Sequence, residues 1–169
     1  LIGPMGSGKS SIGKKLSKMM KFDFLDTDNL IEENTGVDIP TIFEHEGESG
    51  FREREKNILR EISNCQRTVI GTGGGIIISE KNREIIKEMG FVVYLTASIK
   101  ELFYRTEHDK NRPLINSNDA ENKIRDIIND RKEYYESSSD MKISTDNYDT
   151  VKISKIIINN YEKYKKNNS

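Results

Sequence analysis

The chain contains 169 residues, enough for one domain with a single hydrophobic core. It carries 27 Lys and Arg residues against 28 Asp and Glu residues. The resulting net charge of −1 argues against a protein that binds nucleic acid or an anionic membrane. The single cysteine, Cys65, excludes an intramolecular disulfide and a zinc site made of cysteines. No apolar run approaches the length of a membrane span.

A glycine-rich segment begins at Gly3, very near the start of the chain. A loop of this type is fed by a buried strand, and Leu1 and Ile2 alone are too short to form one. We therefore expect the N-terminal strand to be truncated in this sequence, with residues missing upstream of Leu1.

Strand and helix signals alternate along the rest of the chain. Helices are predicted over residues 9–20, 29–35, 51–63, 80–89, 98–105, 120–135 and 151–163, with a further short helix capped by Asp38. Gly36 is expected to end the helix over 29–35, and Ser79 to cap the helix over 80–89. Strands are predicted over residues 22–25, 68–70, 91–95 and 141–144. The polar segment 107–118 is typical of a mobile loop. The alternation indicates an α/β domain whose parallel sheet is covered by helices on both faces.

Residues 3–10 fit the phosphate-binding pattern G-x-x-x-x-G-K-[ST] at every fixed position. The glycines allow backbone N–H groups to curl around a phosphate, and the helix that follows presents its N-terminus to the same anion. In this pattern Lys9 neutralises the phosphates and the hydroxyl of Ser10 is a ligand of Mg²⁺. The segment therefore predicts a nucleotide-binding loop.

Two carboxylates, Asp26 and Asp28, follow the strand predicted over residues 22–25. Ligands of open α/β sheets bind at the carboxyl ends of strands. Two carboxylates that lie two residues apart on an extended segment point the same way, here toward the phosphate loop. One can hold a Mg²⁺-bound water, and the other can accept a proton from a substrate hydroxyl. The alternative is a solvated turn that caps the next helix. The neighbouring phosphate loop favours the functional interpretation.

Further motifs follow in order: Phe51-Arg52-Glu53-Arg54-Glu55, Gly73-Gly74-Gly75, Arg112-Pro113-Leu114, and Arg131 on the long helix after them. Together with the phosphate loop and D-T-D at 26–28, this set strongly resembles the shikimate kinase family over nearly the whole chain. The resemblance implies a three-layer α/β P-loop kinase fold, similar to that of the nucleoside monophosphate kinases. Such a fold has a five-stranded parallel sheet in the order 2-3-1-4-5, helices on both faces and a mobile lid.

The same resemblance implies one kinase domain over 1–169, with a substrate-binding helical region over 29–63 and the lid over 107–118. The implied reaction is transfer of the γ-phosphoryl group of ATP to the 3-hydroxyl of shikimate, in aromatic amino acid (chorismate) biosynthesis. Mg²⁺ is the implied cofactor, and ATP and shikimate are the implied binding partners. We expect a cytoplasmic monomer that binds neither nucleic acid nor membrane.

The family pattern also implies roles for individual residues. The catalytic residues are Lys9, Asp28 and Arg112. The nucleotide is bound by Gly6, Ser7, Gly8, Lys9, Ser10, Ser11, Arg105 and Arg112, with Arg105 near the adenine. The metal is held by Ser10 and, through water, by Asp26. Shikimate is bound by Asp28, Arg52, Glu55, Gly73, Gly74, Gly75 and Arg131. Of these, the two arginines and the backbone of Gly74 and Gly75 hold the carboxylate, and Glu55 orients Arg52.

One segment departs from the family pattern. Residues 145–148 stand where the family often places an arginine or a proline against adenine. Two alternatives remain: another small-molecule kinase of the same fold, such as a gluconate kinase, and a non-catalytic nucleotide-binding module. The combination of D-T-D, F-R-x-x-E and G-G-G fits shikimate better than gluconate. The presence of Asp28, Arg52 and Arg112 argues against an inactive module.

Overall fold

The computed structural model describes residues 1–107, 120–147 and 149–167. Arg112 and the predicted lid over 107–118, apart from Glu107, lie outside these described residues.

Helices and strands alternate as predicted. The elements are α1 (Lys9–Met20), β1 (Asp23–Asp26), α2 (Thr27–Thr35), α3 (Ile39–Ile62), β2 (Thr68–Gly71), the 3₁₀ helix η1 (Ile76–Ile78), α4 (Glu80–Met89), β3 (Val93–Thr96), α5 (Ile99–Thr106), α6 (Ala120–Ser137), β4 (Met141–Ser144) and α7 (Thr150–Asn167). The predicted caps are confirmed, since the side chains of Asp38 and Ser79 accept hydrogen bonds from the backbone of Thr41 and Asn82.

Two helices expected on either side of residue 47 form the single element α3. Gly47 interrupts it with a φ of 68° and a ψ of −175°, a backbone conformation that is nearly restricted to glycine. Arg54 forms an ion pair with Glu46 across this kink. α3 thus consists of two helices that meet at Gly47, in agreement with the two that the sequence predicts.

The strands form two parallel pairs, β1 with β2 and β3 with β4, rather than one five-stranded sheet. Leu1 and Ile2 lie between the pairs. The Leu1 amino group donates to Ile70 O (2.6 Å), and Ile2 N donates to Val93 O (2.9 Å). Ile2 forms an isolated parallel bridge with Tyr94 of β3.

Helices cover both faces of these strands. On one face, Ile12 and Leu16 of α1 and Ile153 and Ile157 of α7 pack in one cluster with Leu95. On the other face, buried side chains of α3, η1, α4 and α6 pack against Tyr94 of β3 in a second cluster. The helical residues of this cluster are Leu59, Ile76, Ile77, Ile86 and Tyr135. Neighbouring residues of β3 thus point to opposite faces, as the pleat of a strand requires.

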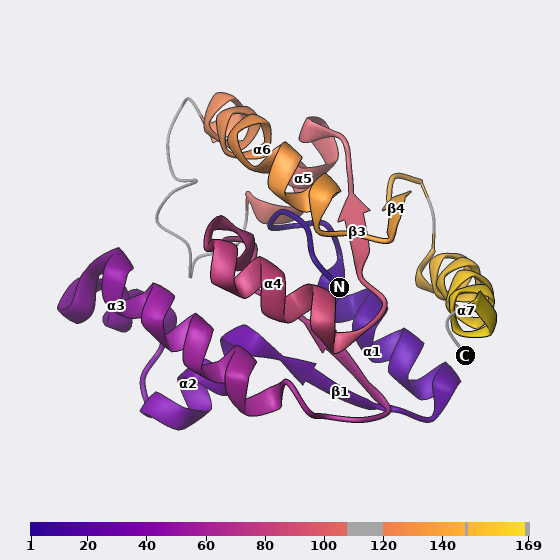
Figure 1. The fold of residues 1–169 in the computed structure, drawn as a ribbon. Coiled ribbons are helices and arrows are strands. Elements are labelled where there is room, and N and C mark those ends of the chain that lie inside the picture. The colour runs from indigo at the N-terminus through magenta and orange to yellow at the C-terminus, as the bar shows by residue number, and fades with distance from the viewer. Residues whose placement is uncertain (108–119, 148, 168–169) are drawn as a thin grey trace.

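Figure 1 shows α2 and α3 together at one end of the molecule and α5 and α6 together at the other. The exposed thiol of Cys65 lies in the link between α3 and β2, before the amino end of β2. Within the described ranges, no helix combines the length and the apolar character needed to cross a membrane.

Candidate active site

The phosphate loop joins Ile2 to the start of α1. Gly6 and Gly8 have φ values of 76° and 89°, a backbone conformation that residues with a Cβ atom rarely adopt. The N-terminus of α1 has no side-chain cap, and an uncapped helix N-terminus favours an anion. The Nζ of Lys9 donates to Gly3 O (2.9 Å) and Pro4 O (2.8 Å), which holds the ammonium group against the loop.

Asp26 lies at the end of β1 and faces the phosphate loop. The Oγ of Ser10 donates to its Oδ2 (2.7 Å), while its Oδ1 accepts from the backbone N of Asp28 (3.1 Å) and caps α2. The capping alternative for this aspartate is therefore confirmed, while its role at a metal stays a prediction. Hydroxyl and carboxylate oxygens are the ligands that Mg²⁺ prefers, with water and phosphate completing its shell. The donor set at Ser10 and Asp26 fits this ion.

Asp26 and Asp28 do not point the same way along one extended segment, so that expectation was wrong. Helix α2 begins at Thr27, which turns the chain between the two carboxylates. Asp28 instead faces the glycine turn: a Cβ built on Gly73 would lie 2.5 Å from Asp28 Oδ1 and 3.0 Å from Glu55 Oε1. The two aspartates thus serve different sides of the site.

Arg52 is held between two carboxylates of its own helix. Its Nη1 donates to Glu55 Oε2 (2.6 Å), and its Nε and Nη2 donate to Glu48 Oε1 (3.2 and 2.8 Å). A guanidinium group has five N–H donors, so one remains on each terminal nitrogen. Two such donors match a carboxylate that binds through both oxygens.

Glu55 is a completely buried carboxyl group behind Arg52. Burial raises its pKa to about 7, although the Arg52 guanidinium opposes the shift. Burial of Arg52 on its own would lower its pKa. The neighbouring carboxylates of Glu55 and Glu48 outweigh this effect, so the pKa of Arg52 is raised. Arg52 therefore stays charged while Glu55 titrates near neutrality.

The glycine turn after β2 brings the remaining predicted substrate residues together. A Cβ on Gly75 would lie 2.6 Å from Arg52 Nη2, so only glycine leaves room for the guanidinium. On the other side, the Nη1 of Arg131 donates to Gly74 O (3.4 Å). The two arginines from α3 and α6 therefore converge on one turn, beside Asp28 and Glu55.

Sequence reasoning missed two residues that shape this turn. The hydroxyl of Thr27 accepts from Gly73 N (2.9 Å), and the hydroxyl of Tyr135 donates to Gly74 O (2.5 Å). Tyr135 lies four residues after Arg131, a spacing that places both on one face of a helix. That spacing was the available signal. For Thr27 the signal was its position between the two aspartates.

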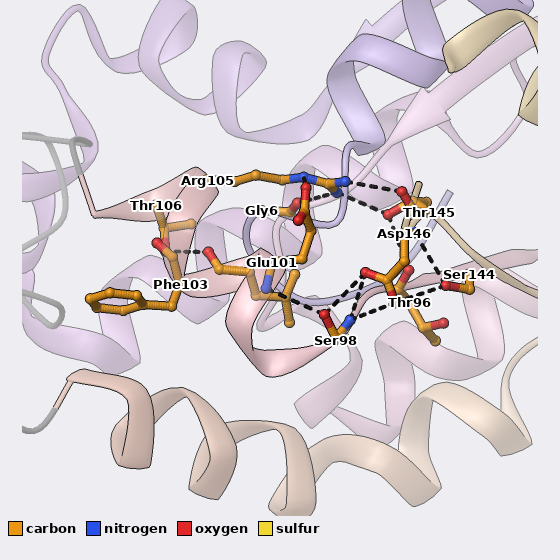
Figure 2. A network of polar contacts seen from close by, with 11 residues as sticks. Gly6, Thr96, Ser98, Glu101, Phe103, Arg105, Thr106, Ser144, Thr145 and Asp146 are labelled. Carbon is orange, nitrogen blue, oxygen red and sulfur yellow. Dashed lines mark hydrogen bonds and ion pairs between the residues drawn. The ribbon is translucent and has the colours of Figure 1, made fainter. Parts of the chain in front are cut away.

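Arg105 links the phosphate loop to the segment after β4 (Figure 2). Its Nη1 donates to Gly6 O (3.1 Å) and to Thr145 Oγ1 (3.0 Å), and its Nη2 donates to Thr145 O (3.0 Å). Asp146 accepts from Ser98 N (2.9 Å), which ties the same segment to the start of α5. Arg105 thus joins Thr145, the first residue of the departing segment, to the phosphate loop.

Comparisons with known proteins agree with this arrangement. A family model described as shikimate kinase matches residues 5–162. The shikimate kinase of Legionella pneumophila (strain Corby) is 42% identical over 164 residues, which cover 97% of this chain and 91% of that protein. That of Haemophilus influenzae (strain PittEE) is 44% identical over 149 residues, covering 86% and 82%.

Solved structures give the same result. Shikimate kinase from Acinetobacter baumannii in complex with shikimate matches with a TM-score of 0.90 and 40% identity, covering 93% of this chain and 88% of that one. A gluconokinase from Sinorhizobium meliloti 1021 has a TM-score of 0.51 and 14% identity, a likeness of fold alone. The chain belongs to the shikimate kinase family.

Proposed function

We propose that the residues around the phosphate loop and the glycine turn carry out the shikimate kinase reaction, in the roles set out below. The chain transfers the γ-phosphoryl group of ATP to the 3-hydroxyl of shikimate, a step of aromatic amino acid biosynthesis. The observation that supports these roles is the convergence of Arg52, Arg131 and two carboxyl groups on the glycine turn, beside the phosphate loop.

The nucleotide binds at the start of α1. The backbone of Gly6, Ser7 and Gly8 surrounds its phosphates, and the Ser11 hydroxyl adds a donor. Lys9 exchanges its bonds with loop carbonyls for bonds with phosphate oxygens. When bound, Mg²⁺ would be held by Ser10 and Asp26 and would neutralise phosphate charge. Arg105 borders the adenine while it braces residue 145.

Shikimate binds with its carboxylate against the two arginines and its hydroxyls toward Asp28. The free N–H donors of Arg52 and the guanidinium of Arg131 receive the carboxylate, together with the N–H groups of Gly74 and Gly75. Gly73 keeps the backbone close to Asp28. That carboxylate orients the 3-hydroxyl and accepts its proton during the transfer. Glu55 holds Arg52 in place from its buried side.

The finer organisation is also a proposal. Leu1 and Ile2 stand in the central position of a five-stranded order 2-3-1-4-5, where β1, β2, β3 and β4 count as strands 2, 3, 4 and 5. Residues 29–63 form the substrate-binding helical region of one kinase domain that acts as a monomer. The lid over 107–118 and the role of Arg112 in the transfer rest on the sequence pattern.

An ADP-release assay across three acceptors tests the proposal. Shikimate, gluconate and a nucleoside monophosphate are compared at equal MgATP concentration. We expect ADP release well above the background only with shikimate. Preference for gluconate would favour the other small-molecule kinase, and release with none of the three would favour a non-catalytic module.

A further inference from the structure

We infer that Tyr135 is a positioning residue for shikimate: its hydroxyl fixes the Gly74–Gly75 peptide so that the Gly75 N–H faces the substrate carboxylate. The inference rests on the proposed carboxylate site and adds to it a residue that does not touch the substrate.

Tyr135 is one of the largest completely buried side chains of the molecule. Its hydroxyl donates to Gly74 O at 2.5 Å, across 61 residues of sequence. Burial raises the pKa of the phenol, so the group stays protonated and remains a donor at all physiological pH values. The ring stacks on Tyr94 at 4.8 Å between centroids and 15° between planes, which leaves the hydroxyl little freedom to move.

The Gly74 peptide is also confined from other sides. The phosphate loop lies close to Gly74, because a Cβ built on Gly74 would be 3.4 Å from both Gly3 O and Met5 N. Arg131 donates to the same carbonyl, at the longer distance of 3.4 Å. The short bond from Tyr135 is therefore the strongest hydrogen bond to the Gly74 carbonyl in the part of the chain that the structure describes.

Because a peptide group is planar, the hydrogen bond from Tyr135 to Gly74 O also orients the N–H of Gly75. The C=O of one residue and the N–H of the next share a plane and point in opposite directions in a trans peptide. All peptide bonds among the described residues are trans. A fixed Gly74 carbonyl therefore fixes the direction of the Gly75 N–H, which has no acceptor among the described residues.

A purely structural role for this hydroxyl makes a different prediction. If the bond only satisfies a buried polar group, its removal lowers stability and affects all ligands equally. If the bond aims the Gly75 N–H, its removal weakens the binding of the carboxylate in particular. The two roles can be separated with a substrate that lacks the carboxylate.

The test is Tyr135→Phe, which keeps the stacked ring and removes only the hydroxyl. The value of kcat/KM is measured for shikimate and for the triol that carries hydrogen in place of the carboxylate. For shikimate we expect a loss of roughly 10- to 150-fold, mostly in KM, as for one hydrogen bond to a charged group. For the triol, and for the KM of MgATP, we expect less than a twofold change.

Tyr94→Phe is the matched control. Tyr94 is buried in the same aromatic pair, but its hydroxyl has no hydrogen bond within the described residues. It should leave both kcat/KM values within twofold of the wild type. Equal losses for shikimate and the triol in Tyr135→Phe, or no loss for either, would overturn the inference. If the wild type itself did not prefer shikimate to the triol, the proposed carboxylate site would fail and the inference with it.

A measurement on the wild-type chain covers the case of a variant that does not fold. With ¹⁵N-labelled glycine, the amide proton of Gly75 should shift downfield when shikimate is added and should stay unchanged with the triol. A Gly75 resonance that ignores shikimate would refute the inference whatever the variant does.

Discussion

Asp26 and Asp28 stand two residues apart, yet their side chains face different parts of the molecule. Asp26 accepts from Ser10 at the phosphate loop, whereas Asp28 lies against Gly73. Because helix α2 begins between them, their side chains are separated by a turn of the backbone rather than aligned. Their contributions to the reaction should therefore be separable by mutation.

Asp28→Asn removes the charge and keeps the size of the side chain. We expect kcat to fall by roughly 10²- to 10⁴-fold, the usual range for a positioned acid–base group, with little change in MgATP affinity. Asp26→Asn should instead raise the Mg²⁺ concentration needed for the half-maximal rate. Initial rates at varied Mg²⁺ and varied shikimate distinguish the two. The assignment is reversed if the metal defect appears in Asp28→Asn.

The glycine turn offers a second comparison between neighbours. In Gly75→Ala the new methyl group would displace the Arg52 guanidinium, so we expect the Kd for shikimate to rise at least about tenfold, the loss of one good charged hydrogen bond. Gly74→Ala is the control, because its methyl group meets only ordinary contacts at 3.4 Å on the phosphate-loop side. Calorimetric titration with shikimate measures both. Equal affinities in the two variants would contradict the placement of Arg52.

At the level of elements, the kink in α3 decides where Arg52 lies. Residues 39–46 approach the later part of the helix closely enough for Glu46 to pair with Arg54, and Glu48 pairs with Arg52 just past the kink. Exposed pairs of this kind contribute little stability each. The conformation of Gly47 therefore matters more to this arrangement than the ion pairs do.

Gly47→Ala should lower the free energy of unfolding by about 1–3 kcal/mol, because alanine is strained at a φ of 68° and a ψ of −175°. Gly36→Ala is the matched control. Gly36 has a similar φ of 72° but a ψ of 8°, in the ordinary left-handed region that ends helices, and it has open space around it. Its replacement should cost less. Urea titration compares them, and a smaller loss at Gly47 than at Gly36 would rule out a strained kink.

Most elements could be predicted from the sequence because their signals are local. Periodic apolar residues, the caps Asp38 and Ser79 and the stop at Gly36 each act within a few positions of the chain. Both helices beside Gly47 were predicted, but the kink that joins them was not, because the sequence does not show the backbone angles that Gly47 adopts. The site motifs were visible as patterns. The bonds of Gly73 to Thr27 and of Gly74 to Tyr135 span 46 and 61 residues, and only the packed fold brings those partners together.

The buried carboxyl of Glu55 links the active site to the stability of the whole molecule. Its pKa is raised in the folded state to about 7, from the ordinary value of 4.5. Below pH 4.5 both states hold the proton and the stabilising contribution is complete. As the pH rises toward 7, the unfolded chain releases its proton first, so this contribution is lost.

Glu55→Gln removes this titration. We expect the wild type to lose up to about 3 kcal/mol of unfolding free energy, relative to the variant, between pH 4.5 and 7. Glu53→Gln is the control, because Glu53 is exposed and its pairing with Lys56 shifts its pKa downward. Denaturant titrations at several pH values give the curves. Parallel curves for wild type and Glu55→Gln would show that the buried carboxyl has an ordinary pKa.

The position of Cys65 has a practical consequence for the whole molecule. Its thiol is exposed and is the only one in the chain. Cys65 precedes the amino end of β2, whereas the glycine turn follows the carboxyl end of the same strand. A maleimide dye or a nitroxide would therefore attach at one defined point on the opposite edge of the strands from the active site. The wild-type chain can carry a fluorescence or spin-resonance reporter with no added or deleted cysteine, and its kinetics can be measured on the same labelled sample.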